Sequence, residues 1–183
     1  QGFWSKRLAR ITEKRNRQVR DAVNKAARLV LNHCLQNLIG TVVFGWNKGM
    51  KQSINLGSKT NQGFVQIPTA FLKDRISQLC EQYGIQFVET EESYTSKASF
   101  LDSDVLPKFG EKPEGWKESG KRIKRGLYRS KDGIKINADC NGAANILRKV
   151  ATTLRLCLEG VSRGALISPL KVRIWTLQES PSL

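Results

Sequence analysis

The stretch from Ser5 to Leu38 contains neither glycine nor proline, and this continuity constrains the fold more than any other feature of the sequence. Glycine and proline are the residues that most readily interrupt a helix, so we expect one long helix or two joined helices here. Apolar side chains recur every three or four residues in the second half, which indicates one buried face. The predicted face consists of Val19, Ala22, Val23, Ala26, Val30 and Cys34.

The first half of this helix is strongly basic. Glu13 and Asp21 alone interrupt its cations, which are Lys6, Arg7, Arg10, Lys14, Arg15, Arg17 and Arg20. A solvated helix face is the ordinary explanation of a charge run, but such faces normally mix both signs. A helix that follows a phosphate backbone explains the nearly unmixed run better.

The whole chain has the same imbalance, because 31 Lys and Arg residues face 16 Asp and Glu residues, which gives a formal net charge of +15. Such an excess usually faces a polyanion, since each neutralised phosphate releases condensed counterions. A membrane surface is the rival partner, but the sequence has no run of about 18 apolar residues and no lipidation motif. We therefore expect nucleic acid and no membrane. Further candidate nucleic-acid-binding residues are Lys48, Lys51, Lys97, Lys121, Arg122, Lys124 and Arg125.

A strand–helix–strand unit follows the long helix. The apolar runs 41–46 and 85–88 predict buried strands, and Pro68 and Gly84 bound a helix between them, after a polar loop over 47–66. Two strands joined in this way run parallel and usually lie side by side. The apolar face expected for the helix is Phe71, Leu72, Ile76, Leu79 and Cys80.

The remaining predicted elements are shorter. Residues 93–121 are predicted to be irregular, and 125–129 and 134–136 to form a hairpin after them. A third helix should run over about 139–158, and the alternating run 170–175 predicts a last edge strand.

Carboxylates stand at two places where an α/β fold exposes its functional edge. Glu89, Glu91 and Glu92 follow the second predicted strand, and Asp139 stands at the start of the third helix. Carboxylates in so basic a chain suit a divalent ion that bridges them to substrate phosphate. A solvated acidic turn and an ordinary helix cap explain the same residues equally well, so the choice stays open at this point.

Cysteine and histidine give no support for a zinc site. Cys34, Cys80, Cys140 and Cys157 are scattered without a Cys-x-x-Cys pair, and His33 is the single histidine. We expect reduced structural cysteines and a cytoplasmic, nucleoid-associated protein.

Three motifs carry a resemblance to a known family. They are Glu-Glu-Ser-Tyr-Thr-Ser-Lys at 91–97, Arg-Ile-Lys-Arg-Gly-Leu at 122–127 and Asn-Ala-Asp-Cys-Asn-Gly-Ala-Ala-Asn-Ile at 137–146. Together with Lys-Arg-Asn at 14–16 and Gly-Trp-Asn-Lys-Gly at 45–49, they resemble TnpB, the OrfB "transposases" of insertion sequences. These proteins are related to eukaryotic Fanzor proteins and to single-RuvC CRISPR effectors.

The resemblance implies a partial RNase H-like (RuvC-type) α/β fold with a long basic N-terminal helix. It also implies a transposon-associated endonuclease that uses a guide RNA and Mg²⁺ or Mn²⁺ to cut DNA. Asp139 matches the third catalytic acid of the family and would be a metal ligand. The first catalytic Asp of the family lies on a strand upstream of the basic helix, so we expect a preceding N-terminal segment and little or no activity of this part alone.

Two further departures from the family pattern concern the second acid and the zinc ribbon. Many members carry the catalytic Glu at the end of the strand that here reads 41–46, where there is no carboxylate. A subset that includes Fanzor proteins has it just before Thr-Ser-Lys, which makes Glu92 the expected catalytic and metal-binding residue and Glu91 the reserve. Adjacent strands lie about 4.8 Å apart, a gap that a Glu side chain can span. Ala98 and Ser99 stand where the first cysteine of the ribbon is expected, so we predict no zinc.

This resemblance divides the chain into three parts and leaves two functions. Residues 1–38 would form a helix like a bridging helix, 39–158 a RuvC-like nuclease core and 159–183 a tail with an edge strand. The alternative to the endonuclease is a nuclease-dead DNA-binding protein that depends on a guide RNA.

Overall fold

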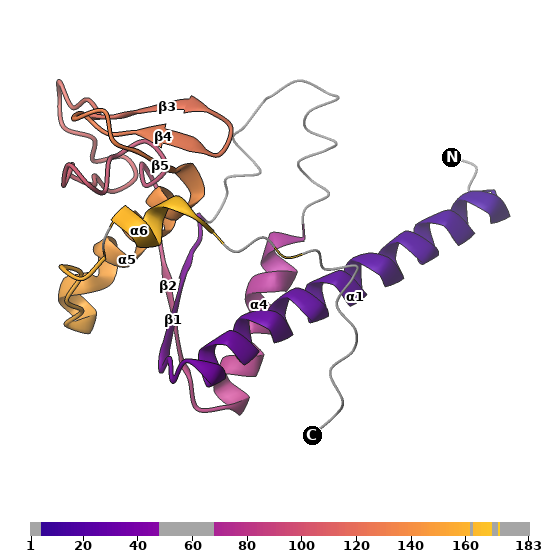
Figure 1. Cartoon of the computed structure of the whole chain (residues 1–183). Helices are drawn as coiled ribbons and strands as arrows, with labels where there is room; N and C mark the ends of the chain where they lie inside the picture. The colour runs from indigo at the N-terminus through magenta and orange to yellow at the C-terminus, as the bar shows by residue number, and fades with distance from the viewer. Residues whose placement is uncertain (1–4, 48–67, 162, 170–171, 173–183) are drawn as a thin grey trace. The chain divides into compact units, whose positions relative to one another are not determined.

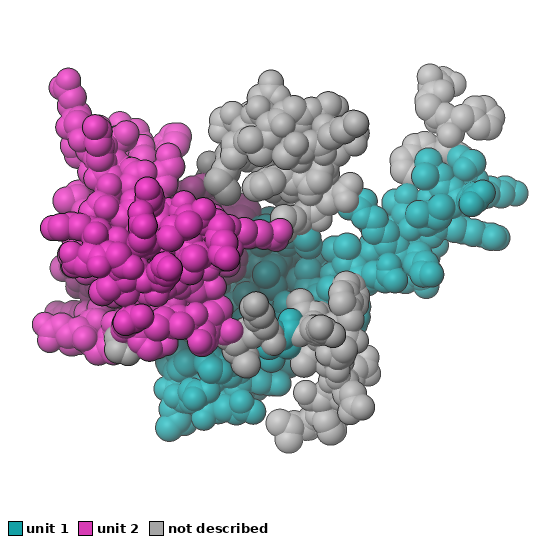
Figure 2. All heavy atoms as spheres, turned by 45° about the horizontal axis from the view of Figure 1, so that its top comes forward, with its two compact units in different colours: residues 1–42, 51–87, 172–183 teal, residues 43–50, 88–171 magenta. Residues whose placement is uncertain are grey.

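The computed structural model describes residues 5–47, 68–161, 163–169 and 172 (Figure 1). The chain forms two compact units, residues 1–42, 51–87 and 172–183 in the first and 43–50 and 88–171 in the second (Figure 2). The fold is mixed α/β and begins with a long helix, as predicted. Lys48, Lys51, most of the predicted loop 47–66 and most of the predicted strand 170–175 lie outside the described residues.

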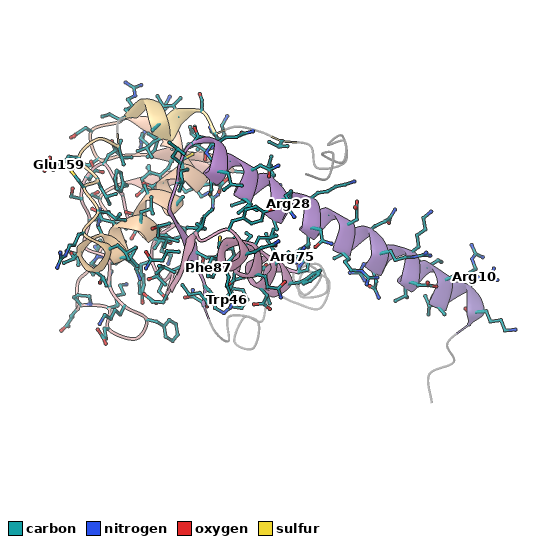
Figure 3. The ribbon with its side chains drawn as sticks, turned by 90° about the horizontal axis from the view of Figure 1, so that it is seen from below. Arg10, Arg28, Trp46, Arg75, Phe87 and Glu159 are labelled. Atoms are coloured by element: carbon teal, nitrogen blue, oxygen red, sulfur yellow. The ribbon has the colours of Figure 1, made fainter. Side chains whose placement is uncertain are left out.

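In the first unit, α1 (Lys6–Gln36) is one continuous helix. It begins at Ser5, whose Oγ accepts a hydrogen bond from the Leu8 N–H at 3.2 Å. Its basic first half is exposed, and Figure 3 shows Arg10 on this part of the helix. None of the helices among the described residues is long and apolar enough to cross a membrane.

The second half of α1 packs on α4 (Thr69–Gln82). The predicted stripe was partly wrong, because Val19, Ala22, Ala26 and Val30 are only half-buried. The buried residues are Val23, Ala27, Leu31 and Cys34 from α1 and Ile76, Leu79 and Cys80 from α4. Helix α4 packs against the i, i+4 row of α1 that contains Ala27 and Leu31. These residues each follow directly after a predicted one, Ala26 or Val30, which is only half-buried. Phe71 is also a correction, since it is 41% exposed near the start of α4.

Strands β1 (Thr41–Gly45) and β2 (Gln86–Thr90) pair with each other. The Gln86 N–H donates to the Gly40 carbonyl at 2.9 Å, and the Trp46 N–H donates to the Thr90 carbonyl at 2.8 Å. Both partners advance along the chain together, so the strands are parallel, as predicted. The strands are half-buried rather than buried, and β2 extends to Thr90, so Glu89 lies within the strand and not past its end.

The second unit contains a three-stranded antiparallel sheet of β3 (Lys121–Lys124), β4 (Leu127–Arg129) and β5 (Lys135–Asn137). The β4–β5 hairpin was predicted. In the structure, its register places Tyr128 opposite Ile136. Strand β3 was not predicted, because all four of its residues are exposed and no apolar alternation marks it. The core of this unit consists of Tyr128, Ile136, Ala138, Ala144 and Leu166.

Helix α5 (Ala138–Leu154) follows β5 directly. Asn137 is its N-cap and accepts hydrogen bonds from the N–H groups of Asp139, at 2.9 Å, and Cys140, at 3.0 Å, which leaves Asp139 in the first turn. The helix ends earlier than predicted, where Arg155 adopts a left-handed conformation with φ of 53°. A short helix that was not predicted, α6 (Arg163–Ile167), contributes Leu166 to the core.

Two aspartates organise the irregular chain before the sheet. Asp104 Oδ2 accepts hydrogen bonds from the N–H groups of Ser99, at 2.7 Å, and Ser119, at 3.1 Å. Asp102 Oδ2 accepts from Ser119 Oγ at 2.9 Å and from the Lys131 N–H at 2.8 Å. Two carboxylates thus cross-link the segment that stands where the family pattern has a zinc ribbon.

Basic residues of α1 should contribute to nucleic-acid binding through charge alone. We expect that replacing Arg10, Lys14, Arg15 and Arg17 together by Ala weakens binding and flattens its salt dependence by roughly three units of log affinity per log salt, because each lost phosphate contact removes about 0.7–0.9. All four side chains are exposed, so the fold should persist. Fluorescence anisotropy over a salt series tests this, with Asn16→Ala/Gln18→Ala as the uncharged control. Affinity that does not change with salt would contradict it.

The Asp102 cross-link should make the second unit sensitive to acid. Burial alone would raise the pKa of Asp102, but hydrogen bonds from the Lys131 backbone, Ser99 and Ser119 outweigh it and hold the pKa below its ordinary value. The stabilisation is therefore present above about pH 4 and is lost as the pH falls through the folded-state pKa.

We expect Asp102→Asn to lower the free energy of unfolding at pH 7 by about 1–3 kcal/mol, with a smaller difference from the unsubstituted protein at pH 3. Denaturant unfolding at the two pH values measures both effects. Asp132→Asn is the matched control, since this aspartate is exposed on the neighbouring turn. Equal losses for the two variants would argue against the cross-link.

Candidate metal-binding carboxylate site

Glu92 lies beside the end of β1. A Cβ atom added to Gly45 would lie 3.1 Å from the Cβ of Glu92 and 2.5 Å from Cδ1 of Ile146 on α5. Only glycine therefore fits at position 45 without displacing its neighbours. The turn is fixed by a hydrogen bond from the Glu92 N–H to Asn47 Oδ1 at 3.1 Å. The chain thus places an acidic residue of the turn after β2 next to the last residue of β1.

The environment of Glu92 disfavours its ionised form. Burial raises the pKa of this carboxyl group, and the negative charge of the adjacent Glu91 raises it further. A divalent cation would reverse this effect, because opposite charge favours the carboxylate. Oxygen ligands of this kind suit Mg²⁺ or Mn²⁺.

Glu91 has a different and more constrained environment. Its Oε1 is paired with Nζ of Lys149, a side chain only 8% exposed on α5. The same Nζ donates to the Pro107 carbonyl at 3.2 Å. Burial would raise the pKa of Glu91, but the Lys149 and Ser93 side chains and the Phe109 backbone hold it below its ordinary value. The second oxygen, Oε2, is buried and has no hydrogen bond of ordinary geometry within the described residues. Glu91 is therefore committed to an ion pair with a buried lysine.

Asp139 is far more accessible. It projects from the first turn of α5, its side chain is 82% exposed, and Oδ1 lies 3.5 Å from Nη2 of Arg122 on β3. An ion pair this exposed contributes little to stability, so the carboxylate can exchange Arg122 for another cation at small cost. A carboxylate and a neighbouring guanidinium could together face a metal ion and a phosphate.

The structure places Glu92 and Asp139 in the same unit but on different parts of it. Glu92 lies at the level of Ile146, which is two helical turns, or roughly 10 Å of helix rise, beyond Asp139. In the described ranges, no three or more His, Cys, Asp or Glu side chains are grouped so that they could hold a metal ion. The described part of the chain thus provides two carboxylates of the right type, without a complete ligand set.

The other predicted site residues lie on exposed surfaces. Glu89 is exposed on β2, and all four residues of β3 are exposed. The predicted nucleic-acid-binding residues that the structure describes are all exposed: Lys6, Arg7, Arg10, Lys14, Arg15, Arg17, Arg20, Lys97, Lys121, Arg122, Lys124 and Arg125.

Two residues that fix the Thr-Ser-Lys turn were missed by the sequence analysis. Asn141 Nδ2 donates to the Ala98 carbonyl at 2.8 Å, and Asn145 Nδ2 donates to the carbonyls of Ala98, at 2.8 Å, and Thr95, at 3.0 Å. Both asparagines are fully buried. Asparagine is a poor helix former, so its recurrence at a spacing of four on one helix face was a signal for this role.

Comparisons with known proteins found one matching family model and a similar solved structure. The family model described as the Cas12f1-like TNB domain matches residues 71–146, a range that contains all three motifs at 91–97, 122–127 and 137–146. A solved structure, the cryo-EM structure of the Cas12f1-sgRNA-target DNA complex, has a similar fold, with a TM-score of 0.53 and 23% identity. The match covers 77% of this chain and 36% of that chain. No curated protein sequence matches detectably. The family-model match and the motifs inside it support a TnpB/OrfB-type protein.

Proposed function

We propose that this chain is the C-terminal part of a transposon-associated, RNA-guided DNA endonuclease with an RNase H-like fold. Glu92 and Asp139 are two of its catalytic carboxylates. The observation that carries the proposal is the 3.1 Å separation between the Cβ of Glu92 and the Cβ position at Gly45. Many TnpB proteins carry their catalytic Glu at the end of this strand, and here the Cβ of an acid from the turn after β2 lies beside that strand end, which supports the same role for Glu92.

Guide RNA and DNA are the proposed partners. The similar solved structure is named as a complex with a single guide RNA and target DNA. The net charge of +15 and the exposed cations of α1 and β3 suit such polyanions. The match covers 36% of that chain, so the proposed activity is that of a whole protein of this kind, with an upstream aspartate as a further proposed ligand.

The residues of this chain would act by binding a metal ion and a phosphate group in fixed positions. Bound Mg²⁺ or Mn²⁺ would supply activation of water and neutralisation of the phosphate. Glu92 and Asp139 would provide carboxylate ligands, while Lys149 keeps Glu91 from competing as a ligand. Arg122, whose Nη2 lies 3.5 Å from Oδ1 of Asp139, would provide a guanidinium group for a phosphate oxygen.

A nuclease-dead, guide-dependent DNA-binding protein is the second candidate. It is favoured by one observation, the absence of a group of three candidate metal ligands from the described residues. The two candidates share their nucleic-acid partners and differ only in hydrolysis. Cleavage by the complete protein therefore decides between them.

In the complete protein with its guide RNA, Glu92→Gln and Asp139→Asn should each reduce DNA cleavage about a hundredfold or more. Metal-based charge stabilisation is worth several kcal/mol, and each 1.36 kcal/mol is a factor of ten. DNA binding should change little, because neither carboxylate contributes positive charge. Single-turnover cleavage and filter binding measure the two quantities. Glu81→Gln, exposed on α4, is the control, and full cleavage by Glu92→Gln would move the role to Glu91 or Glu89.

Stability separates the two neighbouring glutamates without any activity measurement. The raised pKa of Glu92 means that its ionised form destabilises the fold, an effect that sets in as the pH rises through its folded-state pKa. At pH 7, Glu92→Gln should therefore melt at the same or a higher temperature, and Mg²⁺ should stabilise the unsubstituted chain more than this variant.

Glu91→Gln should show the opposite behaviour. It leaves the buried Lys149 ammonium without its carboxylate, so we expect a loss of about 1.5–3 kcal/mol in the free energy of unfolding. Denaturant unfolding with and without Mg²⁺ tests both variants. Equal destabilisation by Glu91→Gln and Glu92→Gln would show that the two carboxylates do not have separate roles.

A further inference from the structure

The turn over 108–111 holds a phenylalanine in solvent. The Glu111 N–H donates to the Lys108 carbonyl at 3.1 Å, and Gly110 has φ of +81°. This is the geometry of a tight turn with glycine at its third position, and it places Phe109 at the second. The Phe109 side chain is 82% exposed. A single exposed apolar residue is normal in proteins, so exposure alone indicates nothing.

The base of this turn is fixed by buried groups. Lys149 donates to the Pro107 carbonyl at 3.2 Å, and Arg148 donates to the Asp104 carbonyl. Trp116 Nε1 closes the loop with a hydrogen bond to the Val105 carbonyl at 3.0 Å. Pro107 itself is buried. The phenylalanine is therefore presented by a tied-down turn rather than by a loose loop.

The loop around the ring carries exposed charges of both signs, and its lysines lie on either side of Phe109. Lys108 and Lys112 flank it and are exposed, with Glu111 between them, and Lys112 Nζ also lies 5.5 Å from the centroid of the Trp116 ring. The fixed turn also has a short connection to the candidate site, because Lys149 bonds both Pro107 and Glu91, the neighbour of Glu92. An exposed aromatic ring near lysines is suited to stack on an unpaired base while the ammonium groups meet its phosphates.

We propose that Phe109 is a positioning residue that stacks on an unpaired base of single-stranded DNA close to the Glu92 site. The proposal deepens the proposed endonuclease function and rests on it for the identity of the strand. Lys149 links the two places physically, since one ammonium group holds both the turn that bears Phe109 and the carboxylate beside Glu92.

Binding of single-stranded DNA by the whole chain tests this directly. A short oligonucleotide carrying 2-aminopurine reports stacking through fluorescence quenching, and its anisotropy reports affinity. Phe109→Ala should lose roughly tenfold in affinity and most of the quenching, within the range for one stacked base. Phe109→Trp should retain both. Val105→Ala, at a side chain 66% exposed in the same loop, is the matched control and should bind normally.

Double-stranded DNA of the same sequence separates stacking from general attraction, because its bases are already stacked on one another. Phe109→Ala should not affect duplex binding, and it should leave the salt dependence of single-strand binding unchanged. Unchanged quenching and affinity in Phe109→Ala would overturn the proposal, as would an equal loss on duplex DNA. Neither result bears on catalysis, which Glu92→Gln tests separately in the complete protein.

Discussion

The ion pair between Glu91 and the buried Lys149 is the contact that ties the irregular segments of the second unit to helix α5. Lys149 is 8% exposed and bonds a carboxylate from the turn after β2 and a carbonyl from the loop at Pro107. One α5 side chain thus fixes two segments that have no regular structure. Removing the Glu91 carboxylate would leave the buried Lys149 ammonium without its charged partner, which costs far more than the pair itself contributes. The pair also leaves Glu92 as the neighbouring acid that is not tied to a lysine in the described structure.

Polar side chains perform the same task elsewhere in this unit. Asn141 and Asn145 hold the backbone of the Thr-Ser-Lys turn, and Asp102 and Asp104 cross-link the chain around Ser119. Tyr128 adds a hydrogen bond from its hydroxyl group to the Lys97 carbonyl at 2.7 Å. A segment without regular structure must satisfy its backbone groups with side chains, and here these groups come from helix α5 and from two acidic residues.

The sequence predicted elements well where local chemistry decides them and poorly where tertiary contacts do. The long helix, the parallel β1–β2 pair and the β4–β5 hairpin follow from periodicity, glycine positions and connection rules. Strand β3 has no apolar pattern, because its four residues are exposed. On α1, Ala27 and Leu31 are buried in place of the predicted Ala26 and Val30, because the packing of α4 decides which residues are covered. For the site, motif resemblance named Asp139 and favoured Glu92 over Glu91, but nothing in the local sequence shows the different environments of the two glutamates. Their separation depends on Lys149, which lies 58 residues away in the chain.

Gly45 places a condition on how such a site can change during evolution. The space beyond its Cα is taken by Ile146 Cδ1 and by the Cβ of Glu92. A carboxylate on the strand and one on the turn would compete for the same volume, so one chain accommodates one of the two arrangements. Passage between them would be easiest when substitutions at positions 45, 92 and 146 occur together. These three positions should therefore covary among relatives. Relatives with the acid on the turn after β2 should have glycine at position 45, and relatives with the acid at the end of the strand should not.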